Sequence, residues 1–310
     1  MNRNSTHITS GRQTATQTMA PPTIQQLLGG YLIESFVALM LYGVFVAQAY
    51  VYALNSAVTD SFILRTSVTT IAALETAHSI FVIHMAYGYA IDAFGNIKAI
   101  AGNILWSGGV SLACEMVIVA LSQGLYIRRV WIMSKGNKLL TSLISVLLTV
   151  RVGFGLGTVV LMYKLKTWSD FRTDRRAYTT VVVGLSLSAL VDLLIALTLM
   201  FYLWKNKSGV KKSDNIVHAL MAYCVNSGLV TTVCSVVTIM TFVFMESSLL
   251  FAGFVHIASK LYANSLMGTL NARGVLRQMA GTVNKSRYAN SNDMEVRYQP
   301  GVSVVSLFVP

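Results

Sequence analysis

The chain has 310 residues, of which 54% are hydrophobic and only 12% are charged, and its mean hydropathy is +0.60. Soluble domains carry about 25% charged residues, so this composition excludes an ordinary soluble domain and favours a membrane protein whose first partner is the lipid bilayer. The net charge is +12. In a membrane protein such an excess marks loops that stay on the cytosolic side, so we expect no nucleic acid partner.

Seven apolar segments follow a polar N-terminal stretch. Residues 1–28 are rich in Ser, Thr, Asn and Gln, and we expect them to form a disordered tail. Residues 29–271 should form one membrane domain, because each apolar segment is long enough for a helix to cross a hydrocarbon core of ~30 Å. The predicted spans are 30–52, 62–87, 103–125, 139–163, 178–203, 216–243 and 249–271. Residues 272–310 are basic and are expected to be mostly disordered. The expected fold class is all-α, an integral membrane bundle of seven transmembrane helices.

Lys and Arg are unevenly distributed between the two sides of this bundle. The loops after the third and fifth spans and the C-terminal tail carry more of them than the N-terminal tail and the loops after the second and fourth spans. Because the richer side stays in the cytosol, we expect the N-terminus outside and the C-terminus in the cytosol, although the basic fourth loop argues the other way. The inner loops would then face a cytosolic partner or anionic lipid, in the plasma membrane or an endomembrane.

The last apolar segment is unusual because it carries polar side chains along one helical face. His256, Lys260, Asn264 and Asn271 line up at helical spacing. A charged ammonium near the middle of a span is unfavourable unless it faces protein or water. We therefore expect Lys260 to face the other helices and to meet a carboxylate there.

Other ionisable residues fall near the middle of their spans and should meet Lys260 in the bundle interior. The predicted intramembrane polar core consists of Glu75, His78, Glu115, Arg151, Asp192, His256, Lys260 and Asn264. Spacing alone suggests two local contacts. Ser188 lies one turn before Asp192 and could hydrogen-bond its carboxylate, and Glu75 lies one turn before His78, close enough to share a proton.

The polar core allows three interpretations. In the first, it holds the helices in register, with Lys260 and Arg151 paired to Glu115 and Asp192. In the second, it is a ligand- or proton-sensitive core whose pairing switches the bundle between two states. In the third, the spans are misplaced and these groups are solvated.

More specific chemistries are not supported by the motifs. A lysine in a seventh span suggests a retinal Schiff base, but microbial rhodopsins carry an aspartate one turn before that lysine, where this chain has His256. We therefore expect no cofactor on Lys260. The five histidines show no metal-ligand spacing, so no metal is expected. The sequence contains no Gly-rich phosphate loop and no plausible nucleophile–base pair, so we predict no catalytic residues and no enzyme activity.

Several motifs resemble a domain-of-unknown-function family of seven-span membrane proteins from mushroom-forming (basidiomycete) fungi. They are residues 75–78 (ETAH), 123–131 (QGLYIRRVW), 189–196 (ALVDLLIA), 212–214 (KSD), 225–231 (VNSGLVT) and 259–273 (SKLYANSLMGTLNAR). The resemblance covers about residues 25–277 and implies a seven-helix fold, but no established activity. It identifies Glu75, His78, Asp192, Lys260, Asn264 and Asn271 as family-motif positions.

These observations favour an orphan receptor-like sensor over two alternatives. The bundle core would bind a small apolar ligand or respond to protons, and the basic inner loops would face a cytosolic partner. An ion, proton or small-molecule transporter could use the same charges as a relay. However, all four prolines lie outside the predicted spans, whereas many transporters have helices broken at mid-depth. A structural membrane scaffold would use the charge pairs for packing alone.

Overall fold

The computed structural model describes residues 23–55, 60–205, 211–245 and 248–290, with side chains described except in 211–227 and 273–290. Helices dominate these ranges, and no β-strand occurs in them beyond an isolated bridge between Asn103 and Thr167. The elements are η1 (Gln25–Gly29), α1 (Gly30–Asn55), α2 (Phe62–Tyr87), η2 (Gly88–Asp92), α3 (Ile97–Gly102), α4 (Trp106–Met133), α5 (Lys138–Leu165), α6 (Trp168–Thr173), α7 (Arg175–Lys205), α8 (Lys211–Phe244) and α9 (Leu250–Asn290).

Five helical segments in the described ranges are long and apolar enough to cross a membrane. They are Gln25–Asn55, Phe62–Asp92, Trp106–Met133, Lys138–Leu165 and Arg175–Lys205. The described side chains of α8 form a shorter apolar segment, Gly228–Phe244. Many large apolar side chains point outwards from the bundle, such as those of Ile33, Phe36 and Met40 on α1. Because a membrane exposes such surfaces to lipid rather than water, the fold indicates an integral membrane protein.

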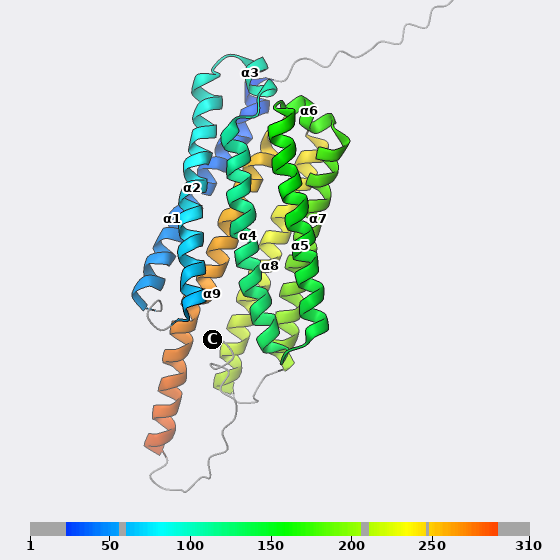
Figure 1. Cartoon of the computed structure of the whole chain (residues 1–310). Helices are drawn as coiled ribbons and strands as arrows, with labels where there is room; N and C mark the ends of the chain where they lie inside the picture. The colour runs from blue at the N-terminus through cyan, green and yellow to red at the C-terminus, as the bar shows by residue number, and fades with distance from the viewer. Residues whose placement is uncertain (1–22, 56–59, 206–210, 246–247, 291–310) are drawn as a thin grey trace, which may run out of the picture.

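The long helices form a ring of neighbours (Figure 1). Contacts run from α1 to α2, α4, α5, α7, α8 and α9, and α9 returns to pack against α1. Further contacts cross the ring, because α4 packs against both α9 and α7, and α2 also packs against α9. The last long helix therefore touches the first, second, fourth and eighth helices. This arrangement brings the polar face of α9 into the interior, where the predicted core was expected.

The two ends of the bundle differ. The short helices α3 and α6 lie at one end (Figure 1), and η1 joins the α8–α9 connection there through a hydrogen bond from Leu249 N to Leu27 O (3.1 Å). We call this the capped end. The facing ends of α1 and α2, of α4 and α5, and of α7 and α8 lie at the opposite end, which α9 extends beyond (Figure 1). Of the loops predicted to be cytosolic, the one between α4 and α5 lies at that opposite end, and the orientation of the bundle stays a prediction.

Short polar caps start the helices at the capped end. Thr167 Oγ1 accepts a hydrogen bond from Asp170 N at 3.1 Å, which starts α6. Asp174 Oδ1 accepts from Ala177 N at 3.2 Å in the first turn of α7. Such oxygens satisfy the free N–H groups of a first helical turn. Arg176 hydrogen-bonds Asp174 and holds the pKa of that carboxyl below its ordinary value.

The structure corrects the predicted boundaries at both termini. Residues 25–29 are helical, with Leu27 and Leu28 buried, so the predicted tail of residues 1–28 ends earlier than expected. At the other end α9 continues past the predicted limit of the span to Asn290. Residues 272–290 contain no proline and several good helix formers, so their polarity does not imply disorder. Residues 1–22 and 291–310, including the apolar C-terminal end, lie outside the described residues.

Other differences concern the helices between the spans. The third span was predicted at residues 103–125, but α4 runs to Met133 because Tyr126, Ile127 and Val130 continue its buried face. The loops after the second and fourth spans contain α3 and α6, which the sequence analysis did not predict. Both are six residues long, which is too short for a clear hydrophobic period.

Candidate functional site

A buried ion pair joins Lys260 of α9 to Glu75 of α2. Lys260 Nζ lies 2.5 Å from Glu75 Oε2 and also donates to Ser79 Oγ at 2.8 Å and to the backbone oxygen of Glu75 at 3.2 Å. Ser259 Oγ donates to the second carboxylate oxygen at 2.8 Å. Both charged side chains are fully buried. These contacts use all three donors of the ammonium, so the pair is well satisfied in a medium without water.

The same face of α9 also binds the backbone of α1. Asn264 Nδ2 donates to Leu41 O at 2.9 Å, and Asn271 Nδ2 donates to Gln48 O at 2.9 Å. Asn264 Nδ2 also donates to Lys260 O at 2.8 Å. Amide side chains that bond to a neighbouring helix are a common form of interhelical attachment in membranes. Two residues of the polar face therefore serve to hold α1 against α9.

His78 and His256 pack against each other, with ring centroids 5.4 Å apart. Neither ring nitrogen of His78 has a hydrogen-bond partner among the described residues. The prediction that Glu75 and His78 share a proton is therefore wrong, because the carboxylate turns to Lys260 and Ser259 instead. His256 Nδ1 lies 3.5 Å from Ser111 Oγ, while its Nε2 has no partner in the described part of the chain.

Asp192 of α7 belongs to a second polar cluster. Its carboxylate accepts a hydrogen bond from Gln123 Nε2 of α4 at 2.7 Å and another from the hydroxyl of Tyr262 of α9. Ser188 does not contact the carboxylate as predicted, because its Oγ lies 3.0 Å from the Tyr262 hydroxyl. Tyr262 lies on the α7 side of α9, whereas Lys260 faces α2. Asp192 of α7 and Glu75 of α2 therefore bind different side chains of α9, Tyr262 and Lys260.

Glu115 and Arg151 are both about 4% exposed but do not form an ion pair within 4.0 Å, although both are fully described. Glu115 Oε2, Arg151 Nε and Arg151 Nη1 have no hydrogen-bond partner in the described residues. The predicted pairing of Lys260 and Arg151 with Glu115 and Asp192 is thus corrected: Lys260 pairs with Glu75, and Arg151 leaves two donor atoms free. Similar depth in the membrane does not decide the pairing, because each helix also has a rotational setting.

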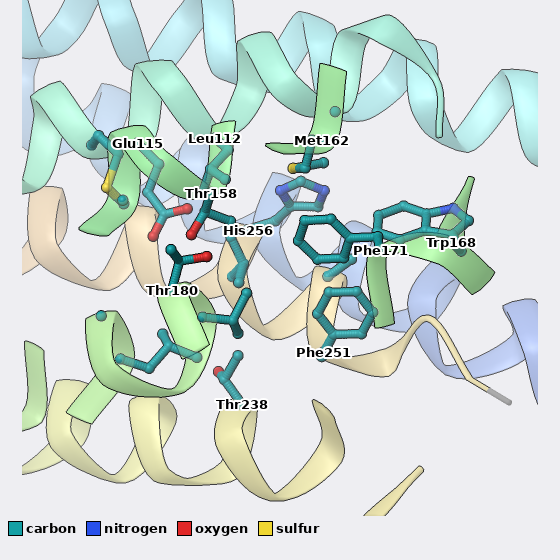
Figure 2. A pocket seen from close by; sticks show the side chains of 18 of the residues that line it. Leu112, Glu115, Thr158, Met162, Trp168, Phe171, Thr180, Thr238, Phe251 and His256 are labelled. Carbon is teal, nitrogen blue, oxygen red and sulfur yellow. The ribbon is translucent and has the colours of Figure 1, made fainter. Parts of the chain in front are cut away.

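These unpartnered atoms border a cavity of about 90 Å³ near the capped end (Figure 2). Residues of α2, α4, α5, α6, α7, α8 and α9 line it. Its polar lining includes Glu115, Arg151 and His256, while most of the remaining wall is apolar. Figure 2 shows Glu115 on one side of the cavity and His256 beside Phe171 and Met162 on the other. A mostly apolar cavity with a few convergent polar groups is the usual form of a small-molecule site.

Three threonines in the wall have already used their hydroxyl protons. Thr158 donates to Phe154 O at 3.0 Å, Thr180 donates to Ala177 O at 2.9 Å, and Thr238 donates to Cys234 O at 2.7 Å. Each bond stays within the threonine's own helix, as is common for hydroxyls in membrane helices. These threonines can therefore accept but not donate a further hydrogen bond. Glu115, Arg151 and His256, by contrast, have atoms without a hydrogen-bond partner in the described wall. We call Glu115 and Arg151 the charged pair of the cavity.

An aromatic cap closes the cavity at the capped end. Trp168 and Phe171 of α6 and Phe251 of α9 line it, and the Trp168 ring packs edge-on against Phe251 with centroids 5.5 Å apart. Trp168 Nε1 also donates to the hydroxyl of Tyr89 at 2.9 Å. A tryptophan at the end of an apolar segment usually lies at the membrane interface, but Trp168 is 4% exposed and is positioned by α6.

Arg172 fixes this cap to the neighbouring helices. It donates to Phe242 O at 3.0 Å near the end of α8 and to Ser248 O at 2.6 Å before α9. Its guanidinium lies 4.7 Å from the Phe251 ring centroid and 5.3 Å from that of Phe242. A cation is favourable at the free carbonyl groups of a helix C-terminus. A second hollow, of about 360 Å³, lies beyond Trp168 and Arg172.

The sequence analysis missed several residues of the site. Glu34 of α1 is 7% exposed, and its Oε2 has no partner in the described ranges. It lies against the first turn of α9, where a side-chain carbon on Gly253 would come within 2.0 Å of that oxygen. The signal was present, because Glu34 is an acid inside an apolar segment, but its position near the end of the segment placed it outside the expected core. Gln123 and Tyr262 were missed because neutral polar residues are common in such helices.

No group of three or more His, Cys, Asp or Glu side chains in the described residues is placed to hold a metal ion. Lys260 does not line the cavity. The expectations of no metal, no retinal and no catalytic residue remain predictions.

Residues 188–275 match the model of a family of unknown function (DUF6534). The match includes much of α7, all of α8 and the first part of α9, and therefore Asp192, His256, Lys260, Asn264 and Asn271. It supports the presence of a domain of unknown function, as the resemblance implied. No curated protein and no solved structure is significantly similar to this chain.

Proposed function

We propose that this protein is a receptor-like sensor in which all seven long helices cross the membrane. The N-terminus and the capped end face outwards, and the C-terminus faces the cytosol. The basic loops at the opposite end would then lie in the cytosol, as the bias of Lys and Arg favours. In this orientation the cavity lies near the outer end of the bundle, behind the side chains of α6, so a ligand that enters past this cap would not have to cross the membrane. The fungal origin suggested by the sequence motifs belongs to the same proposal.

The observation that carries the proposal is the cavity with unpartnered charged groups. Burying a polar atom without a partner is unfavourable by about 1–3 kcal/mol, and more for charged groups. Glu115, Arg151 and His256 together leave four such atoms at one cavity: Oε2, Nε, Nη1 and Nε2. A structural scaffold would gain stability by pairing or replacing them. A protein that binds a ligand needs them free until the ligand arrives.

The position of His256 supplies a route from the cavity to the ion pair. His256 lines the cavity, and Lys260 lies one turn further along α9. A ligand that displaces His256 would move the turn of α9 that carries the ammonium. A ligand can shift a conformational equilibrium only by its difference in affinity between two states. The proposed difference is the setting of α9 against α2, held in one state by the Lys260–Glu75 pair.

Binding can be tested with purified protein in lipid nanodiscs. Small apolar compounds that bind the folded form should raise its melting temperature in a concentration-dependent way. The matched control is Val255→Phe, which places a ring into the cavity without altering a charge. A broad panel that never distinguishes the two proteins would contradict the proposed ligand site.

Orientation needs a separate test. A single cysteine placed at Lys98 or at Lys138, in a chain without its other cysteines, should react with an impermeant maleimide from opposite sides of intact cells. The proposal requires the first site to react from outside and the second only after permeabilisation. The reverse pattern would place the capped end in the cytosol.

A transporter is the second candidate, favoured by one observation. The cavity, the His256–His78 ring contact and the Lys260–Glu75 pair follow one another along the interior, so ionisable groups extend from the capped end into the bundle. Such a series can relay protons. Proteoliposomes with an internal pH-sensitive dye separate the candidates, because only a transporter gives a gradient-driven signal that Glu75→Gln abolishes.

A further inference from the structure

We propose that the cavity between α4, α5 and α9 selects a neutral molecule with a compact apolar body and one group that both donates and accepts a hydrogen bond, such as a small alcohol. This inference rests on the proposed ligand site and specifies the chemistry of its ligand. It depends on three features of the wall: the charges, the direction of the free hydrogen bonds, and the size and polarity of the rest of the surface.

The charges of the wall favour a neutral ligand. In their ionised forms Glu115 and Arg151 are opposite in sign, and both are about 4% exposed, so the ionised pair adds no net charge to the cavity. A cationic or anionic ligand would leave one uncompensated charge in a region without water, which is strongly unfavourable. Lys260 and Glu75, which do not line the cavity, already neutralise each other.

The free hydrogen-bonding atoms favour a group with both roles. Glu115 Oε2 can only accept from a ligand when ionised, whereas Arg151 Nε and Nη1 can only donate. The two side chains are not joined by an ion pair within 4.0 Å, although both are fully described. A hydroxyl placed between them could donate to Glu115 and accept from Arg151, which joins the two charges through the ligand. An ether or a ketone would satisfy only Arg151, and a hydrocarbon would satisfy neither.

The remaining wall favours a small apolar body. Its aromatic side is formed by Trp168, Phe171 and Phe251, and aliphatic and methionine side chains form most of the rest. Thr158, Thr180 and Thr238 have used their protons within their own helices, so they offer little competition to the charged pair. The volume of about 90 Å³ is of the same order as an engineered cavity of ~150 Å³ that admits benzene. A ligand of about that size fits.

Four probes of one chain length test the proposal: 1-hexanol, hexane, hexylammonium and hexanoate. Each is titrated against the wild-type protein in nanodiscs, with the melting temperature as the readout, and the shift in Val255→Phe is subtracted to remove effects of partitioning into lipid. We expect 1-hexanol to bind about tenfold to a hundredfold more tightly than hexane, because hydrogen bonds to charged groups contribute that much. The two charged probes should give no cavity-dependent shift.

Two conservative variants make the test specific to the charged pair. Glu115→Gln leaves Arg151 as the unbalanced charge, so hexanoate should now raise the melting temperature. Arg151→Gln leaves Glu115 unbalanced, so hexylammonium should do so. Because each variant is destabilised by its own unbalanced charge, the rescuing probe is measured as a recovery of stability. Should Val255→Phe fail to fold, Leu185→Trp fills the same cavity from α7.

The outcomes separate this inference from the proposed function. If hexane binds as tightly as 1-hexanol, or if a charged probe binds the wild type best, the cavity is a ligand site but the inferred chemistry is wrong. If the variants bind hexanoate and hexylammonium no better than the wild type does, Glu115 and Arg151 do not determine which ligand binds, and the inference also fails. If no probe gives a cavity-dependent shift in any of these proteins, the proposed ligand site itself is rejected.

Discussion

Lys260 and Glu75 form a fully buried ion pair, with Nζ 2.5 Å from Oε2, although 185 positions separate them in the chain. The pair joins α9 to α2 inside the ring of helices. The three hydrogen bonds of the ammonium and the bond from the Ser259 hydroxyl give partners to polar atoms that would otherwise be buried without any. Removing one partner should therefore lower the free energy of unfolding much more than removing both.

We predict that Lys260→Met and Glu75→Gln each lower the free energy of unfolding by about 3–5 kcal/mol, because each leaves an unbalanced buried group. The double variant should recover a large part of that loss. Unfolding in detergent, followed by circular dichroism, provides the double-mutant cycle. Lys164→Met is the matched control, since Lys164 is exposed on α5. Equal effects of Lys164→Met and Lys260→Met would mean that the pair contributes nothing particular.

A second prediction concerns Tyr262, whose hydroxyl donates to Asp192 and lies 3.0 Å from Ser188 Oγ. Tyr262→Phe should destabilise the protein by about 1–3 kcal/mol, because it leaves a buried carboxylate oxygen with one donor fewer. Tyr163→Phe is the control: its hydroxyl donates to Trp106 O at 2.9 Å, but Tyr163 is exposed. The same thermal or chemical denaturation serves for both, and a larger effect at Tyr163 would contradict the assigned importance of the Asp192 cluster.

The third prediction concerns the attachment of the cap. Arg172→Lys should speed amide hydrogen exchange in residues 248–252, since a lysine cannot reproduce the planar fork that holds Phe242 O and Ser248 O together. Exchange in α5 should not change. Arg175→Lys, on the exposed start of α7, is the matched control. Unchanged protection of residues 248–252 would show that the cap does not depend on the guanidinium.

A fourth prediction separates threonine hydroxyls from the charged pair. Thr180→Val keeps the shape of the side chain and removes a hydroxyl that bonds only to Ala177 O among the described residues. It should change stability by less than about 1 kcal/mol and leave ligand-induced melting shifts intact. Glu115→Gln should change those shifts as described above. A loss of the shifts in Thr180→Val would instead place the hydroxyl in direct contact with the ligand.

The sequence was sufficient to place the long helices and to single out Lys260 as an interior charge. Both follow from local rules: an apolar run of membrane length makes a helix, and a lysine within it needs a partner. The identity of that partner was beyond the sequence. Glu75, Glu115 and Asp192 lie at similar depth, and the choice among them depends on how each helix is rotated and which helices are neighbours.

The cavity was also beyond the sequence, for a related reason. Side chains from seven helices line a space near α6 that they do not fill, among the residues that the structure describes. The sequence of any one helix does not show that this space will form. The role of Trp168 illustrates the difficulty. A tryptophan at the end of an apolar segment usually anchors the membrane interface, yet the short helix α6 turns this one inwards. Only the tertiary arrangement distinguishes these outcomes.

The contact of α9 with α1 and α2 has a consequence for how the protein is made. During synthesis α2 is made before α9, and Glu75 precedes Lys260 by 185 positions, so Glu75 is at first present in the chain without its cation. Asp192 is likewise made before Tyr262, whose hydroxyl donates to it in the folded protein. A chain that ends before α9 would therefore lack the cation of Glu75 and the Tyr262 donor of Asp192, which would keep its hydrogen bond from Gln123. The last helix thus supplies partners for carboxylates on two helices that are made before it.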